Sequence, residues 1–142
     1  MICTMGMRVL VIDDEPDIRD LLVMLLRDDP RCDLVTATGE LDSAVELTVE
    51  TAPDVVVVDV MFGHRTCADV LPELRTAAPA AHIIVFTSSR RAAMGLGLLD
   101  LGADVIVQKV TVSFDEVANL ALTPPLHLPD AEPVAPGPGS ST

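Results

Sequence analysis

Arg8-Val9-Leu10-Val11-Ile12-Asp13-Asp14-Glu15-Pro16 is the most informative segment for the fold of this chain. Its apolar run favours a buried β-strand, and two carboxylates follow where that strand would end. Pro16 favours the first turn of a helix, where no backbone N–H is needed. A strand that passes directly into a helix predicts βαβ units, and therefore a parallel sheet covered by helices.

Short apolar runs and helical patterns alternate through the rest of the chain. The first helix is expected to begin at Glu15-Pro16 and to stop before Pro30. Further strands are predicted near 34–37, 55–58, 83–87 and 105–107, and further helices near 41–51, 70–78, 90–101 and 113–122. This order predicts an α/β fold with a five-stranded parallel sheet, doubly wound as (βα)5.

Two glycines lie inside the helix expected over 90–101. Gly95 and Gly97 would each cost about 1 kcal/mol of helix stability relative to alanine. We nevertheless expect one continuous helix there, which ends at Gly102.

Composition predicts one folded domain and a disordered tail. Apolar residues make up 49% of the 142 residues, which is enough for a buried core, and we assign the domain to residues 1–122. Residues 123–142 contain six prolines and two glycines and show no periodicity, so a disordered, proline-rich tail is expected.

Charge and cysteine content exclude several classes of function. A net charge of −13 argues against binding to nucleic acid or to an anionic membrane surface. Three widely spaced cysteines fit reduced thiols, and no apolar stretch is long enough to span a bilayer. We therefore expect a soluble, cytoplasmic protein.

Polar residues follow the predicted strands where each strand ends. They are Asp13 and Asp14, Asp59, Thr87, and Lys109, the only lysine of the chain. In an open α/β sheet the carboxyl ends of the strands form the ligand-binding edge, so these side chains are expected to converge there.

The residue types at this edge suit phosphoryl transfer. Carboxylate oxygens are ligands for Mg²⁺, and a carboxylate such as that of Asp59 can act as a nucleophile and form an acyl phosphate. The Lys109 ammonium and the Thr87 hydroxyl would then hold the phosphoryl oxygens.

Taken together, these motifs resemble the receiver domain of two-component response regulators, over about residues 7–122. The resemblance rests on Val11–Pro16, Asp54–Met61, Phe86–Ser88, Leu101–Asp104 and Lys109. It implies a flavodoxin-like fold in which Asp59 is the phosphoacceptor, Thr87 is the switch hydroxyl and Lys109 pairs with Asp59. It also implies that Mg²⁺ is held by Asp13, Asp14, Asp59 and the backbone carbonyl of Met61.

The resemblance further implies partners and a mode of action. A histidine kinase, a phosphotransfer protein or a small phosphodonor would supply the phosphoryl group. The chain would catalyse only its own phosphorylation and dephosphorylation and would not be an enzyme for an external substrate. Because residues 123–142 show no helix-turn-helix pattern and no basic patch, we expect a stand-alone receiver. It would contact a target protein through residues 90–101, 105–107 and 113–122, and a homodimer is compatible with this interpretation.

Four positions depart from the family pattern. Ile106 replaces the aromatic residue that reports phosphorylation, and Val110 replaces the proline after the lysine. Gly63 stands in place of another proline, and Cys67, which we interpret as a small buried thiol, in place of a glycine. These departures favour an alternative, a degenerate receiver that acts as an interaction module without phosphorylation.

A second alternative is a phosphatase of the haloacid-dehalogenase type, which also uses an aspartyl nucleophile. That family carries D-x-D-x-T after its first strand, whereas this chain has Asp13-Asp14-Glu15-Pro16-Asp17. The proline lies where a mobile loop would be needed, and the length leaves no room for a cap domain, so this alternative ranks last.

Overall fold

The computed structural model describes residues 6–88, 93, 95–109 and 113–123. The main sheet consists of β1 (Met7–Ile12), β2 (Cys32–Thr38), β3 (Val55–Val58), β6 (His82–Thr87) and β7 (Val105–Gln108). A small hairpin consists of β4 (Met61–Phe62) and β5 (Arg65–Thr66). The helices are α1 (Pro16–Arg27), α2 (Leu41–Thr51), η1 (Cys67–Asp69, 3-10), α3 (Leu71–Ala77), α5 (Leu98–Leu101) and α6 (Phe114–Leu122).

The predicted parallel sheet is confirmed, with the strand order β2-β1-β3-β6-β7. All four strand pairs are parallel. After β1 the chain forms β2 on one side of β1 and then β3 on the other side, so the strand order reverses at β1. At that switch point Ile12 is level with Thr38 of β2 and with Val58 of β3. The residues that follow β1 and β3 therefore start from neighbouring positions at one edge.

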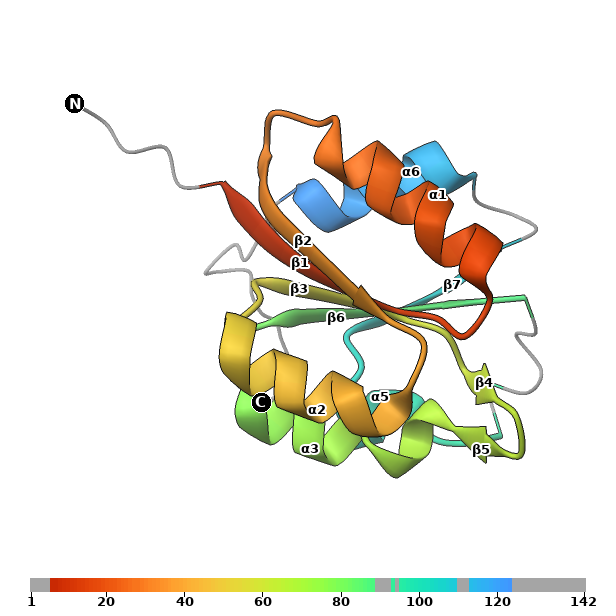
Figure 1. Ribbon diagram of the computed structural model, residues 1–142. Coiled ribbons are helices and arrows are strands. Elements are labelled where there is room, and N and C mark those ends of the chain that lie inside the picture. The colour runs from red at the N-terminus through yellow and green to blue at the C-terminus, as the bar shows by residue number, and fades with distance from the viewer. Residues whose placement is uncertain (1–5, 89–92, 94, 110–112, 124–142) are drawn as a thin grey trace, which may run out of the picture.

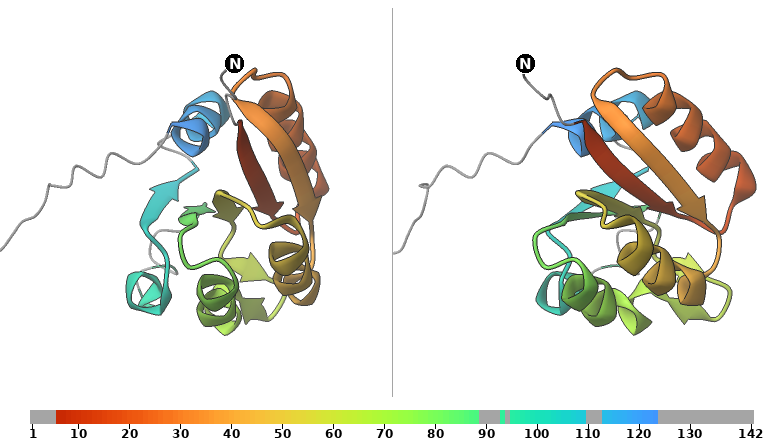
Figure 2. Two further views of the ribbon diagram at one scale, coloured as in Figure 1. Left: turned by 90° about the vertical axis from the view of Figure 1, so that its left-hand side faces the viewer. Right: turned by 60° about the vertical axis from the view of Figure 1, so that its left-hand side comes forward.

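Helices cover both faces of the sheet, as the doubly wound prediction required. Helices α1 and α6 lie on one face, and α2, α3 and α5 lie on the other (Figures 1 and 2). Side chains alternate along each strand, so that Val9 and Val11 pack toward α1 and α6 while Leu10 and Ile12 pack toward the opposite layer. The all-valine strand β3 is buried on both faces for the same reason.

Several element boundaries match the prediction and others extend it. Helix α1 begins at Pro16, and α2 spans Leu41–Thr51 as expected. Strand β2 is longer than the predicted segment at both ends because it pairs along the whole of β1. The hairpin of β4 and β5 was not predicted, since each of its strands is only two residues long and carries no measurable periodicity.

The expectation of one continuous helix over 90–101 is wrong for the part that the structure describes. Helix α5 spans only Leu98–Leu101, and Gly97 precedes it with a φ of 62°. That left-handed conformation is incompatible with the interior of a right-handed helix, and glycine adopts it without strain. Gly97 was therefore a stronger signal than the apolar periodicity. Gly102 ends the helix as predicted. Residues 89–92 and 94 lie outside the described part of the chain.

Two further predictions concern the ends of the chain and membranes. Helix α6 ends at Leu122, and the tail expected over 123–142 lies, apart from Thr123, outside the described residues. Val110 lies outside them as well. Across the described ranges, no helix combines the length and the apolar character needed to cross a membrane.

Candidate functional site

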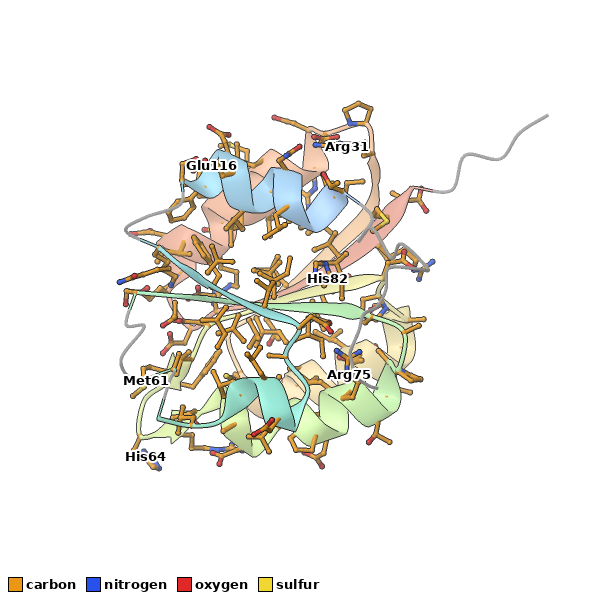
Figure 3. All side chains as sticks on the ribbon, turned by 180° about the vertical axis from the view of Figure 1, so that it is seen from behind. Arg31, Met61, His64, Arg75, His82 and Glu116 are labelled. Carbon is orange, nitrogen blue, oxygen red and sulfur yellow. The ribbon has the colours of Figure 1, made fainter. Side chains whose placement is uncertain are left out.

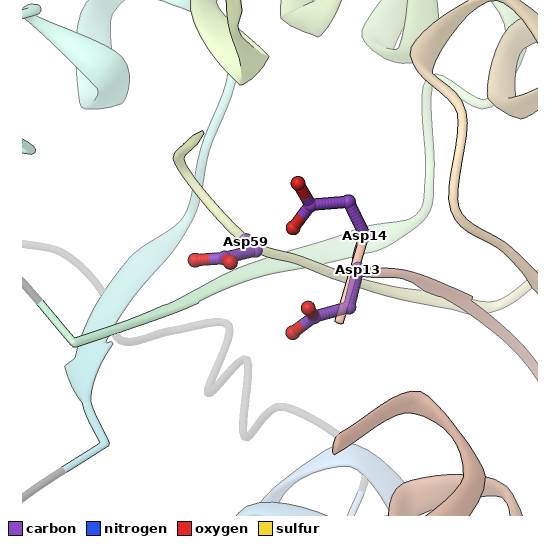
Figure 4. A group of neighbouring side chains, drawn as sticks. All are labelled: Asp13, Asp14 and Asp59. Atoms are coloured by element: carbon purple, nitrogen blue, oxygen red, sulfur yellow. The ribbon is translucent and has the colours of Figure 1, made fainter. Parts of the chain in front are cut away.

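Three carboxylates meet at the carboxyl edge of the sheet, as the sequence predicted (Figure 4). Asp13 and Asp14 follow β1 and Asp59 follows β3, and one oxygen of each lies within 4.8 Å of the others. Asp13 and Asp59 are 2% and 7% exposed, whereas Asp14 is open to solvent. The group therefore has a buried floor and an exposed side through which a ligand can enter.

Lys109, the only lysine of the chain, brings its ammonium into this cluster. Its Nζ lies 3.1 Å from Asp13 Oδ2, 3.4 Å from Asp59 Oδ2 and 3.6 Å from Glu15 Oε1. Only 7% of the lysine side chain is exposed, and Nζ also lies 5.5 Å from the centre of the Phe86 ring. The predicted contact with Asp59 is present, but the shorter contact is with Asp13, so one cation is shared among several carboxylates.

Backbone N–H groups hold the two buried carboxylates in place. The Glu15 N–H donates to Asp13 Oδ1 over 3.0 Å, and the Val60 N–H donates to Asp59 Oδ1 over 2.7 Å. The backbone of Asp59 is also tied to β1, because its N–H donates to the Ile12 carbonyl. In each buried carboxylate, one oxygen is thus held by the local turn and the other faces Lys109.

Burial and mutual repulsion make ionisation of these carboxylates costly. Burial, followed by the negative charge of Asp13, raises the pKa of Asp59 to about 6, although Lys109 and the Val60 N–H act in the opposite direction. Burial likewise raises the pKa of Asp13 against the opposing effects of the Glu15 N–H and Lys109. Burial disfavours the charged form of Lys109, but the charges of Asp59 and Asp13 outweigh it and raise the lysine pKa. A single ammonium therefore leaves the cluster with excess negative charge.

Such a cluster fits a small divalent cation. Mg²⁺ takes oxygen ligands, usually one or two carboxylates together with water or phosphate oxygens. Asp13, Asp14 and Asp59 supply oxygens at a mutual distance that allows one ion to bind them together. The exposed position of Asp14 leaves room for water and phosphate oxygens on the outer side.

The remaining predicted site residues border the cluster. Thr87 is the last residue of β6 and is buried, and its carbonyl accepts the Lys109 N–H over 2.7 Å, which ties the two strand ends together. Met61 begins β4 with an exposed side chain and follows Asp59 by two residues (Figure 3). The role of its carbonyl as a metal ligand stays a prediction.

Two residues at this edge were missed from the sequence. The Glu15 carboxylate lies close to Lys109, and its position directly after Asp13-Asp14 could have revealed it. The Arg19 guanidinium donates from Nη1 to the Asp13 carbonyl over 2.8 Å. Nothing in the sequence indicates that contact, because arginine on a helix is usually a solvated residue.

Cys67 lies at the start of η1 and is fully buried. Burial, with a further contribution from the charge of Asp59, raises the pKa of its thiol to about 12. A thiol with this pKa stays protonated at neutral pH and is a poor nucleophile. The interpretation of Cys67 as a small buried thiol is confirmed.

Comparison with known proteins agrees with the fold. The family model of the response regulator receiver domain matches residues 9–120. A two-component response regulator of the LuxR family from Aurantimonas sp. superposes with a TM-score of 0.70 at 26% identity, over 81% of each chain. The receiver domain of the putative response regulator NarL from Mycobacterium tuberculosis superposes with a TM-score of 0.73 at 23% identity, over 84% of this chain and 95% of that one.

The curated relatives are longer than this chain. The chain is 34% identical over 97 residues to a protein-glutamate methylesterase/protein-glutamine glutaminase of Rhizobium etli, which covers 68% of this chain and 28% of that protein. It is 34% identical over 109 residues to the probable transcriptional regulatory protein TcrX of Mycobacterium tuberculosis, covering 77% of this chain and 45% of that protein. It thus spans less than half of either relative. The match of the family model over most of its length shows that the chain belongs to the response regulator receiver domain family.

Proposed function

We propose that this receiver accepts one phosphoryl group on Asp59 in a Mg²⁺-dependent reaction. Receiver domains are the phosphoacceptor switches of two-component systems, and binding of Mg²⁺ is typical of the family. The observation that supports the proposal most directly is the cluster itself. The Asp59 carboxylate is buried beside Asp13 and Asp14, with the Lys109 ammonium 3.4 Å away. Asp13, Asp14, Asp59 and the Met61 carbonyl would hold the ion.

The side chains of the site have distinct tasks in this reaction. A bound Mg²⁺ supplies neutralisation of negative charge on the transferring phosphoryl group. An ionised Asp59 oxygen attacks phosphorus and forms a new O–P bond, while the bond from phosphorus to the donor breaks and its electron pair leaves with the donor. Ionised Asp59 needs no general base, and its Oδ1 is oriented by the Val60 N–H.

Lys109 and Thr87 would act on the product, an acyl phosphate. Lys109 is already within ion-pair distance of Asp59 Oδ2, so a small movement brings its ammonium to a phosphoryl oxygen. The Thr87 hydroxyl would donate to another phosphoryl oxygen from the end of β6. Attack of water on phosphorus would later release inorganic phosphate and restore the carboxylate.

Partners follow from the same proposal. A histidine kinase or a phosphotransfer protein would supply the phosphoryl group in the cytoplasm, and the receiver would act as a switch with no external substrate. Signalling would proceed through protein contact on the surface that α5, β7 and α6 form at the β7 edge of the sheet, without direct binding to DNA. A cavity of about 510 Å³ between α5 and β7, bordered by Leu98, Val105 and Ile106, supports this choice of face. A homodimer on the same face is a further prediction, which sedimentation analysis would test.

One observation favours the alternative of a phosphorylation-independent receiver. Ile106 lies in β7 and lines that cavity. An isoleucine has no ring that could turn inward toward Thr87, so the usual coupling between threonine and an aromatic residue cannot operate in this chain. The alternative keeps the fold and the contact face but requires no phosphoryl group.

Intact-protein mass spectrometry distinguishes the two functions. After incubation with acetyl phosphate and Mg²⁺, the wild type is expected to gain one phosphoryl group, and EDTA or Asp59→Ala should prevent the gain. Asp54→Asn is a matched control, because Asp54 lies directly before β3 and Asp59 directly after it. This variant should gain one phosphoryl group as the wild type does. A phosphoryl group that persists in Asp59→Ala would contradict the assignment. No gain from acetyl phosphate or from a phosphorylated histidine kinase would favour the phosphorylation-independent module.

A further inference from the structure

Two residues outside the acidic cluster, Arg19 and Gly39, lie against the loop between β1 and α1. We infer that Arg19 and Gly39 form a latch that fixes the peptide group between Asp13 and Asp14 and thereby positions the Asp14 carboxylate for a cation. The inference rests on the proposed magnesium site. Arg19 would act as a positioning residue, since it touches the backbone of the loop and none of the reacting atoms.

Asp14 needs such support because its side chain has none of its own. Among the described residues, the Asp14 carboxylate has no hydrogen-bond or ion-pair partner, whereas Asp13 receives the Glu15 N–H and the Lys109 ammonium. Asp14 is also exposed. Its position therefore depends on the backbone that carries it, and a carboxylate that is free to turn loses entropy when it binds an ion.

Arg19 holds that backbone. Its Nη1 donates to the Asp13 carbonyl over 2.8 Å, and the Asp13 N–H donates to the Thr38 carbonyl over 3.1 Å. The Asp13 carbonyl belongs to the peptide unit that also contains the Asp14 N–H, and this unit is planar. A hydrogen bond to the carbonyl oxygen of this plane therefore restricts the position of the Asp14 Cα, from which the side chain leaves the backbone.

Gly39 completes the latch because it lacks a side chain. A Cβ at this position would lie 2.5 Å from Arg19 Nη1 and 3.5 Å from the Asp13 carbonyl oxygen. The first distance is too short for any real contact, so the guanidinium, which ends a flexible side chain, would have to shift from its present position. Gly39 follows β2 directly and, like Asp14, lines a cavity of about 280 Å³ beside the cluster. The end of β2 is thereby coupled through Arg19 to the ligand-bearing loop.

The two residues allow geometry to be separated from charge. Arg19→Gln removes both the positive charge and the forked donors of the guanidinium. Gly39→Ala keeps the guanidinium but displaces it from the position in which it contacts the Asp13 carbonyl. If the latch acts by position, both variants should weaken binding of Mg²⁺ by a similar factor. If Arg19 acts only through its charge, Gly39→Ala should change little.

Calorimetric titration of the full chain with Mg²⁺ tests the inference. Loss of a residue that orients metal ligands typically weakens affinity by about 10-fold to 100-fold, and because the contact is to the backbone we expect about 10-fold for Arg19→Gln and for Gly39→Ala. The double variant should also lose about 10-fold rather than the product of the two, since both changes break one contact. Arg19→Lys should recover part of the loss.

Matched controls separate this effect from a change in stability. Arg27→Gln removes the same charge from the last turn of the same helix and should leave the affinity for Mg²⁺ unchanged. Nuclear magnetic resonance in EDTA should show shifts of the Asp14 and Glu15 amides in both latch variants, while urea unfolding shows that the fold persists. Wild-type affinity in the latch variants, or full additivity in the double variant, would overturn the latch. Absence of Mg²⁺ binding by the wild type would overturn the proposed site and the latch with it.

Discussion

Aspartates stand at both ends of the main sheet, and the two groups have opposite surroundings. At the amino ends of the strands they are acceptors for the backbone. Asp54 Oδ2 receives the Arg8 N–H over 2.9 Å. Asp104 Oδ2 receives the Ile83 N–H over 2.7 Å and the Arg75 guanidinium over 2.8 Å. Figure 3 shows Arg75 and His82 on this side of the molecule. Each of these carboxylates accepts a hydrogen bond from a backbone N–H near the start of a neighbouring strand.

At the carboxyl ends, the carboxylate oxygens of the aspartates outnumber the donors that reach them from the described residues. Asp13 and Asp59 each have one backbone N–H and share Lys109, and Asp14 has no partner among the described residues. Asp13 and Asp59 are also more deeply buried than Asp104, of whose side chain 43% is exposed. The comparison teaches that the supply of donors, and not the residue type, separates a structural aspartate from one that is available to a ligand.

The largest expected effect on stability comes from the amino end. Arg75→Ala removes hydrogen bonds to the carbonyls of Gly102, Ala81 and Pro79 and to the Asp104 carboxylate. We expect the free energy of unfolding to fall by about 3 kcal/mol, because partly buried acceptors lose a charged donor. Urea unfolding followed by circular dichroism measures this, since the chain has no Trp or Tyr for fluorescence. Arg27→Ala is the control. An equal loss of unfolding free energy in that variant would show that the hydrogen bonds of Arg75 at the amino end are not the cause of the loss.

The carboxyl end should respond in the opposite direction. In EDTA at neutral pH, Asp59→Asn should raise the free energy of unfolding by about 2 kcal/mol, because a pKa of about 6 in the folded state makes ionisation of Asp59 costly. The native state keeps this proton longer than the unfolded state, whose pKa is near 3.8. Stability associated with protonated Asp59 is therefore complete below pH of about 4 and is lost as the pH rises through about 6.

Urea unfolding of wild type and Asp59→Asn at several pH values measures this difference. It should be near zero at acid pH, grow between pH of about 4 and 6, and then stay constant. Saturating Mg²⁺ should reduce it by stabilising the wild type. A stability difference that does not depend on pH would show that the surroundings of Asp59 do not raise its pKa. The aspartates at the two ends of the sheet would then not differ in the cost of their ionisation.

The smallest expected effect is that of Asp54→Asn. An asparagine can still accept the Arg8 N–H through its amide oxygen, so only the charge of the acceptor is lost, at an exposed position. We expect the free energy of unfolding to change by about 0.5 kcal/mol, with no dependence on Mg²⁺. A change as large as that of Asp59→Asn would contradict the assignment of Asp54 to a structural role.

Local patterns were sufficient for most of the fold. Alternating apolar runs and helical periodicity predicted the five strands of the sheet and the start of α1 at Pro16. They failed for 90–101, where the left-handed conformation of Gly97 interrupts the expected helix. They also missed the hairpin of β4 and β5, because elements of two residues have no period. Periodicity reports which face is buried but not where a glycine turns the backbone.

The sequence by itself determined the class of the fold and the membership of the acidic cluster, because the carboxyl ends of parallel strands must share an edge. Asp13, Asp14, Asp59 and Lys109 could therefore be named before any coordinates. Only the tertiary structure decided how the donors are divided among them. The preference of Lys109 for Asp13 and the contact of Arg19 with the Asp13 carbonyl over Gly39 depend on differences of a few tenths of an ångström in the distances between separate elements. Such distances are set by how helices pack on the sheet, and no local pattern in the chain encodes them.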